Sequence, residues 1–264
     1  LLNKGVFFGG SNYAAYDALG FVRALIYGGT DANAPATIAS AATLGLDDIT
    51  KNVAISGDIT AQTTASVNTL KLGASNLALA SGTDVLTTNG LLSSGSASAS
   101  ISGGRLQSAA NGELVVRVDG SADKLTIAST IQNNTSTALT KSGDGTLLLT
   151  GANTYTGATF IGGGVVELGG AGTLNNGNYS GAIAVVNGAV LNITTSANQT
   201  LGGATSGAGR INVTGSGVVT LLSARSASSP VLSVSNGSTI AGTLTAFGTG
   251  TAADFILDGA TLRV

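Results

Sequence analysis

The chain has no cysteine, histidine, methionine or tryptophan, and charged residues make up only 9% of its 264 positions. Without cysteine there is no disulfide and no thiolate chemistry. Without histidine, the commonest general base and the commonest metal ligand are both missing. Ordinary soluble domains carry about 25% charged residues. The surface of this protein must therefore be built mainly from small, neutral polar groups.

The few charges are scattered and sum to −2. No basic patch is present, so nucleic acid is not an expected partner. No apolar run approaches the roughly 18 residues of a membrane-spanning helix, so no membrane span is predicted. Because the chain starts at Leu1 and finishes on the strand-like GATLRV, we expect a processed chain or a segment of a longer one.

What the chain has instead is glycine, 40 residues of it, and short apolar strands. After about residue 50, aliphatic residues alternate with polar ones at a period of two, as at Val53 and Ile55 or Leu191 and Ile193. Each pair is typical of a short strand with one buried face. Gly-Gly, Asn-Gly, Asp-Gly and Ser-Gly turns separate them. The pattern predicts an all-β protein.

Similar turn-plus-strand units recur along the chain. NGAVLNI (187–193), NGSTI (236–240) and DGATLRV (258–264) each join a turn dipeptide to an aliphatic strand, and the last two begin 22 residues apart. That spacing is close to one coil of a β-solenoid, in which short strands stack in parallel around a narrow core. With about 20 residues and about 4.8 Å per coil, the rod would be roughly 60 Å long.

The alternative fold is an antiparallel β-sandwich made of hairpins, because Asn-Gly is also a hairpin signal. Sandwich strands recur every 8–12 residues or so, and several segments here satisfy that spacing. Aromatic residues, however, make up only 4% of the chain, which is little for a sandwich core. The low aromatic content and the unchanging units favour the solenoid.

The first 35 residues differ in composition. They hold much of the aromatic content, namely Phe7, Phe8, Tyr13, Tyr16, Phe21 and Tyr27. We predict that residues 1–35 form an N-terminal cap or junction segment, because terminal coils need a different surface. An aromatic patch for glycans or for a neighbouring subunit is the functional alternative. Residues 36–264 are predicted to form the solenoid.

At 139–174 the sequence LTKSGDGTLLLTGANTYTGATFIGGGVVELGGAGTL resembles the autotransporter-associated β-strand repeat, also called the passenger-associated transport repeat. The resemblance implies a right-handed parallel β-helix in a secreted or surface-displayed bacterial protein, where the repeat is associated with passenger folding during export. The positions that match the pattern, which we expect to have a structural role, are Lys141, Gly143, Gly145, Leu147, Leu149, Gly151, Asn153, Thr154, Tyr155, Gly157 and Thr159.

Parallel β-helices also include polysaccharide-acting enzymes, so the acidic residues matter. Glycoside hydrolysis needs two carboxylates that face each other, whereas adjacent strand residues such as Asp47 and Asp48 point to opposite faces. Other acids are spread thinly. No calcium-binding nonapeptide series and no phosphate-binding loop is present. We therefore predict no enzyme, no catalytic residues, no metal and no cofactor.

The leading interpretation is a structural β-solenoid segment of a bacterial extracellular fibre, stalk or matrix protein, with end-to-end polymerisation of the chain on itself as a further expectation. The second is an adhesin passenger that binds a glycan or a protein through its lateral face. The third is a polysaccharide-acting β-helix enzyme. The first two place the protein outside the cell or on its surface.

Overall fold

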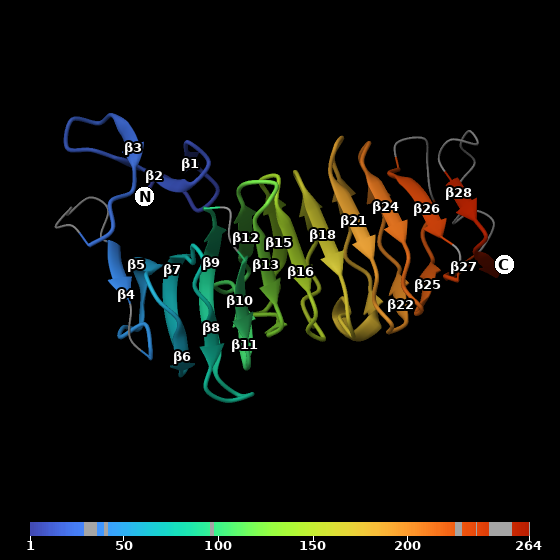
Figure 1. Ribbon diagram of the computed structural model, residues 1–264, viewed down its shortest axis with the longest axis horizontal. Helices are drawn as coiled ribbons and strands as arrows, with labels where there is room; N and C mark the ends of the chain where they lie inside the picture. The colour runs from blue at the N-terminus through green and yellow to red at the C-terminus, as the bar shows by residue number, and fades with distance from the viewer. Residues whose placement is uncertain are drawn as a thin grey trace.

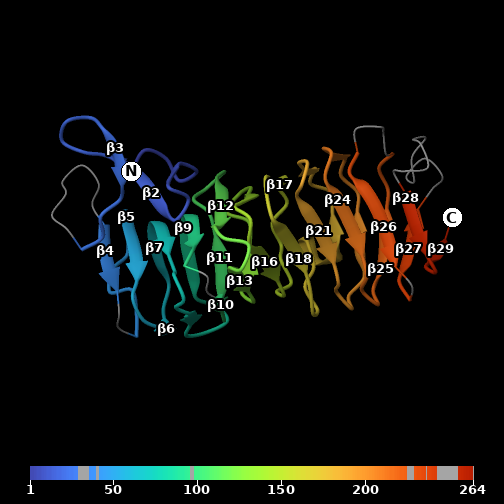
Figure 2. The ribbon, with the colours of Figure 1, turned by 45° about the horizontal axis from the view of Figure 1, so that its top comes forward.

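The computed structural model describes residues 1–28, 36–39, 42–95, 98–224, 229–235, 237–242 and 255–263. The described chain forms an elongated stack of short strands that run across the long axis of the molecule, with a small antiparallel sheet on one side near the N-terminus (Figures 1 and 2). Successive coils follow one another along the axis in chain order.

Three sheets line the stack. The 10-stranded sheet contains β6 (Ile59–Gln62), β8 (Leu77–Leu79), β10 (Ser98–Ser102), β13 (Lys124–Ile127), β16 (Thr146–Leu149), β18 (Val165–Leu168), β21 (Val190–Ile193), β24 (Arg210–Val213), β26 (Val231–Ser235) and β28 (Phe255–Asp258).

The 11-stranded sheet contains β4 (Ala36–Ala39), β5 (Asp48–Ile55), β7 (Ala65–Lys71), β9 (Val85–Ser93), β12 (Glu113–Val118), β15 (Ala138–Ser142), β17 (Thr159–Ile161), β20 (Ile183–Val185) and β23 (Thr205–Ser206), with β11 (Arg105–Gln107) and β14 (Thr130–Ile131) as a side branch. The 5-stranded sheet contains β19 (Asn178–Tyr179), β22 (Gln199–Leu201), β25 (Val218–Leu221), β27 (Thr239–Gly242) and β29 (Thr261–Arg263), and the 3-10 turn η1 (Asn175–Gly177) precedes it.

All strand pairs within these three sheets are parallel and pair one coil with the next. Leu125 pairs with Leu147, which pairs with Val166, and the column continues through Leu191 and Ile211. The protein is therefore a parallel β-solenoid, as its sequence predicted. The alternative, an antiparallel sandwich, is wrong because the strands of the stack that the structure describes pair in parallel from coil to coil instead of forming hairpins.

The period-two pattern explains the core. Within each strand, alternate residues are buried, as in β16, where Leu147 and Leu149 are inside while Thr146 and Leu148 are partly exposed. The inward hydrophobic residues of the stack form one continuous cluster from Ala39 to Ile240. Because each coil is only a few residues wide, aliphatic side chains fill this core almost alone.

The N-terminal residues form a separate three-stranded antiparallel sheet, β1 (Phe7–Phe8), β2 (Asn12–Tyr16) and β3 (Val22–Ala24). It lies on the side of the stack, over its first coils (Figure 1). Residues 29–35, where the predicted N-terminal segment meets the solenoid, lie outside the described residues, as do Asn236 and Val264 of the predicted repeat units. That this sheet acts as a cap stays a prediction.

None of the segments that the structure describes is a helix with the length and hydropathy needed for a membrane crossing.

Candidate functional site: the repeat coil

The sequence pattern at 139–174 winds once around the stack and into the next coil. It runs through β15, β16, β17 and β18, and an isolated bridge joins Ala152 to Thr173. Leu139 pairs with Thr159, twenty positions later, so one coil here takes 20 residues. The pattern therefore spans more than one coil, and its residues recur at the corners where consecutive coils touch.

The glycines of the pattern stand where one coil rests on the backbone of the preceding coil. A Cβ atom added at Gly151 would lie 2.6 Å from the carbonyl oxygen of Ser129, and one at Gly145 would lie 2.6 Å from that of Asp123. At Gly143 and Gly157 the added atom would overlap the carbonyl oxygens of Val118 and Thr137. Gly143 also has φ +77°, which disfavours other residues. These corners exclude any side chain.

Lys141 points into the core. It lies in an inward column between Val116 and Ile161 and is fully buried. Its ammonium group donates hydrogen bonds to the carbonyl oxygens of Ser142 (2.9 Å), Gly143 (2.8 Å) and Gly163 (3.2 Å). The three protons of the ammonium thus meet three corner carbonyls from two successive coils. The side chain therefore runs through the core and hydrogen-bonds the backbone at this corner.

Burial makes this lysine easier to deprotonate. Desolvation, with a smaller contribution from Arg117, lowers the pKa of Lys141 from its ordinary 10.5 to about 7, while Asp144 opposes the shift. An ammonium is poorly solvated inside an aliphatic column. Its free energy in the folded protein therefore depends on the three carbonyl contacts.

Asn153 joins three coils at another corner. Its Oδ1 accepts a hydrogen bond from the backbone N–H of Ile131 (2.9 Å) in the preceding coil. Its Nδ2 donates to the carbonyl oxygens of Gly151 (3.0 Å) and of Thr173 (3.0 Å) in the following coil. The side chain is fully buried and its amide is matched on both sides. Next to it, the backbone N–H of Thr154 donates to the carbonyl of Ile131 (2.8 Å).

Tyr155 lies inside the stack, with Thr159 and Tyr179. The Tyr155 hydroxyl is 2.9 Å from Thr159 Oγ1, which is 2.8 Å from the Tyr179 hydroxyl. The Tyr179 hydroxyl donates to the carbonyl of Gly157. The two rings meet edge to face, with centroids 5.6 Å apart. Burial raises the pKa of Tyr155 well above its ordinary value and that of Tyr179 to about 12.

Pattern matching missed several inward polar residues. Gln199 is buried, and its Oε1 accepts from the backbone N–H of Leu174 (2.8 Å) while its Nε2 donates to the carbonyl of Thr200 (2.8 Å). Gln62 repeats this with the N–H of Leu44 (2.6 Å) and the carbonyl of Thr63 (2.8 Å). Gln199 alternates with the buried Leu201 on β22, so the period-two pattern could have placed it inward. Gln62 follows the buried Ile59 by three residues across an irregularity of β6, so that pattern does not place it.

Asp47, Asp48 and another of the scattered acids, Asp84, lie at partly or fully exposed positions, in turns or at the start of a strand. The Asp47 carboxylate accepts from the backbone N–H of Ser66 (2.7 Å) in the next coil. Hydrogen bonds from Thr50 lower the pKa of Asp48, and a hydrogen bond from Ser81 lowers that of Asp84. Each of these carboxylates has hydrogen-bond partners in its own or the neighbouring turn. Among the described residues there is no group of three or more acidic residues placed to hold a metal ion.

The segment that contains these buried corner residues also matches the model of a known repeat family. Residues 139–168 match the passenger-associated-transport-repeat family. The repeat recognised in the sequence is thereby confirmed for this segment. The matched transport repeat runs from the inward Leu139 of β15 to Leu168 at the end of β18, so it includes the Lys141 corner, the Asn153 corner and Tyr155. No curated protein and no solved structure gives a significant match to the chain.

Proposed function

We propose that the protein is a structural β-solenoid segment of a bacterial extracellular fibre, stalk or matrix protein, exported as a passenger and displayed outside the cell. The observation that carries the proposal is the use of the transport repeat. Its lysine, asparagine and tyrosine are buried and hydrogen-bonded within the stack. In this proposal the repeat serves to hold coils together, and the chain has no catalytic role.

Polymerisation through the coil ends is the finer part of the proposal. Leu257 continues the inward column of Val234, and Leu262 continues that of Ile240. Val234 and Ile240 are 0% exposed, whereas Leu257 and Leu262 are 41% and 39% exposed. These two leucines occupy core positions, and no coil among the described residues covers them. An unpaired strand edge with exposed core residues favours the addition of another strand, here from a second copy.

Electron microscopy tests this part of the proposal. At high concentration we expect the purified chain to form filaments longer than a single rod. Leu257→Asp places a charge in the proposed contact and should leave isolated rods. Ile256→Asp is the matched control, because Ile256 is the outward neighbour on the same strand and is equally exposed. Isolated rods of the unsubstituted chain, or filaments that persist with Leu257→Asp, would contradict end-to-end growth through this face.

The second candidate is an adhesin passenger. It is favoured by the side chains of the N-terminal sheet, where Leu19 and Phe21 are 81% and 68% exposed at the turn between β2 and β3. Large exposed apolar residues on a structured turn are typical of contact surfaces. Saturable, competable binding to glycans or cells that is lost with Phe21→Ser would support this function. Phe160→Ser, on the exposed face of β17, is the matched control.

The third candidate, a polysaccharide-acting enzyme, rests on the fold alone. Incubation of the protein with acidic polysaccharides, followed by assays for unsaturated and reducing ends, tests it directly. Release of either product would replace the structural proposal.

A further inference from the structure

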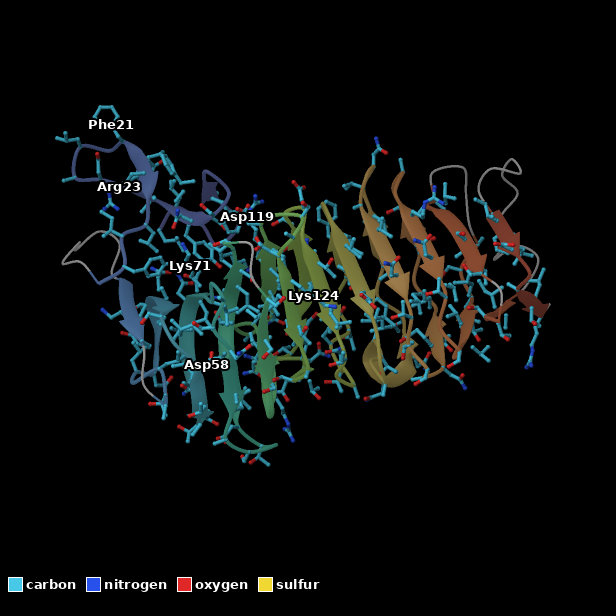
Figure 3. The ribbon with its side chains drawn as sticks, viewed as in Figure 1. Phe21, Arg23, Asp58, Lys71, Asp119 and Lys124 are labelled. Atoms are coloured by element: carbon cyan, nitrogen blue, oxygen red, sulfur yellow. The ribbon has the colours of Figure 1, made fainter. Side chains whose placement is uncertain are left out.

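Residues 1–28, here called the strap, lie against the outward face of the 11-stranded sheet. Figure 3 shows Lys71 and Asp119 where the strap meets the stack, and Phe21 on the part of the strap that points away from it. The contacts below come from β7, β9 and β12 or from residues that directly follow them, so the strap crosses three successive coils. It contacts residues 59 to 109 positions away in sequence.

Side chains make the polar contacts between the strap and the stack. Lys4 Nζ donates to the carbonyl of Glu113 (2.7 Å), and Lys71 Nζ donates to Asn12 Oδ1 (2.7 Å). Arg117 Nε donates to the carbonyl of Gly10 (2.8 Å), and its guanidinium lies 5.1 Å from the centre of the Phe7 ring. Among the described residues, no strand of the strap pairs with a strand of the stack.

The apolar contact is centred on Tyr13 and Gly90. A Cβ atom added to Gly90, in the middle of β9, would lie 2.8 Å from the Tyr13 hydroxyl, so the tyrosine occupies the space that glycine leaves. Tyr13, Ala15 and Leu25 form a cluster with Leu92 of β9 that is separate from the continuous core. The coils below therefore do not need this cluster to fill their interior.

Hydrogen bonding in the contact between the strap and the stack is also incomplete. The hydroxyl groups of Tyr13 and Tyr27 are buried and have no hydrogen-bond partner within the described residues. A buried hydroxyl without a partner destabilises the state that buries it. By contrast, the buried Tyr155 and Tyr179 of the stack are both hydrogen-bonded.

We propose that the strap is a releasable element, which detaches from the stack as a unit while the coils beneath it stay folded. Detachment breaks a few side-chain contacts and frees two unsatisfied hydroxyls, whereas opening the stack would break parallel strand ladders. It uncovers Leu92, which lies between the cations Lys71 and Arg117, together with the neighbouring outward pair Gly90 and Val115. The strap thus acts as a cover for a mixed apolar and cationic strip on the lateral face.

Native-state hydrogen exchange on the full chain tests the proposal. We expect the amides of β2 and β3 to exchange well before those of β13, β16 and β18, through an opening that depends little on denaturant. Gly90→Val obstructs the position of Tyr13 and should speed exchange of the strap about tenfold or more. Tyr13→Phe removes an unsatisfied hydroxyl and should slow it about fivefold. Both variants should leave exchange in β13, β16 and β18 unchanged.

Ala184→Val is the matched control for Gly90→Val. Ala184 stands outward on β20 in the same column as Gly90, beyond the coils that the strap contacts. Ala184→Val should change amide exchange in neither the strap nor β13, β16 and β18. Exchange of the strap and the stack at one common rate, or equal changes in both regions with Gly90→Val, would overturn the proposal. So would faster exchange of the strap with Tyr13→Phe.

Discussion

Individual residues of the transport repeat are fitted to contacts between coils rather than to chemistry at a surface. Lys141, Asn153 and Tyr155 each bring polar atoms into the core and find partners for them there. The energetic balance at such positions is asymmetric. A matched buried polar group contributes little net stability, but removal of one partner exposes the full desolvation cost of the other.

Lys141 should give the protein a measurable pH dependence. Its pKa is about 7 in the folded chain and near 10.5 when unfolded, so between these values the unfolded chain binds more protons. Stability should therefore rise from pH 7 to about 9.5. Lys141→Met should show a smaller rise in urea midpoint over this range, the remainder coming from Lys4, Lys71 and the amino group of Leu1, whose pKa values burial also lowers.

Lys124→Met is the control for that series, because Lys124 is partly exposed and alternates with the inward Leu125 on β13. Lys124→Met should show the same rise in urea midpoint with pH as the unsubstituted chain. An unaltered rise in Lys141→Met would show that this lysine is not desolvated in the folded protein.

Gly157 should not tolerate a methyl group. Gly157→Ala would press Cβ onto the carbonyl of Thr137 in the preceding coil, and we expect a loss of about 1–3 kcal/mol in unfolding free energy. Gly82→Ala is the control, since no atom lies within 4 Å of the added Cβ. Urea denaturation measures both. Equal stability of the two variants would mean that the corner can shift to admit a side chain.

At the scale of elements, the short strands are stabilised by pairing with strands of neighbouring coils. Strands of two to five residues, such as β17 and β19, have little stability of their own. β17 persists because it is paired on both sides by strands of the adjacent coils, β15 and β20, and β19 is paired with β22 of the following coil. The strap lacks such pairing, so its internal turns matter more.

The turn between β2 and β3 should depend on Asp17. Its Oδ1 accepts hydrogen bonds from the backbone N–H groups of Leu19 (2.8 Å) and Phe21 (2.8 Å). Asp17→Ala should destabilise this turn by about 1 kcal/mol and speed amide exchange at both residues. Exchange in β16 should stay as it is. Unchanged exchange at Leu19 and Phe21 would show that the backbone alone holds the turn.

At the scale of the whole molecule, the stack is quasi-one-dimensional, because each coil pairs with the coils directly before and after it. Removing one complete coil should then shorten the rod by about 4.8 Å and preserve the fold. Deletion of 139–158 removes the 20 positions between the paired Leu139 and Thr159. We expect circular dichroism typical of β-structure and protected amides in the flanking coils.

Deletion of 139–148 is the out-of-phase counterpart. It removes about half a coil, so the strands that follow would meet the wrong sheet and turn polar side chains inward. This variant should lose protection on both sides of the deletion. If both deletions behave alike, coil register does not control the fold.

The solenoid was predictable because its determinants are local and repeated. Alternation such as Leu147 and Leu149 tells inside from outside, and glycine turns such as Gly143 mark corners. The repeat at 139–174 was identified by its resemblance to the family pattern, since eleven matching positions form one ordered run. The inward Gln199 was missed because a polar residue in an alternating strand normally indicates the exposed face, and the inward Gln62 because β6 departs from alternation.

The sequence by itself determined that the chain is all-β and that its strands are short, narrow and stacked, because side-chain alternation and turn chemistry act within a few residues. Tertiary structure alone decided which corners meet, so only there do the three carbonyls around Lys141 and the three coils joined by Asn153 become visible. The docking of Tyr13 over Gly90 likewise follows from packing between distant segments, for which a linear pattern carries no signal.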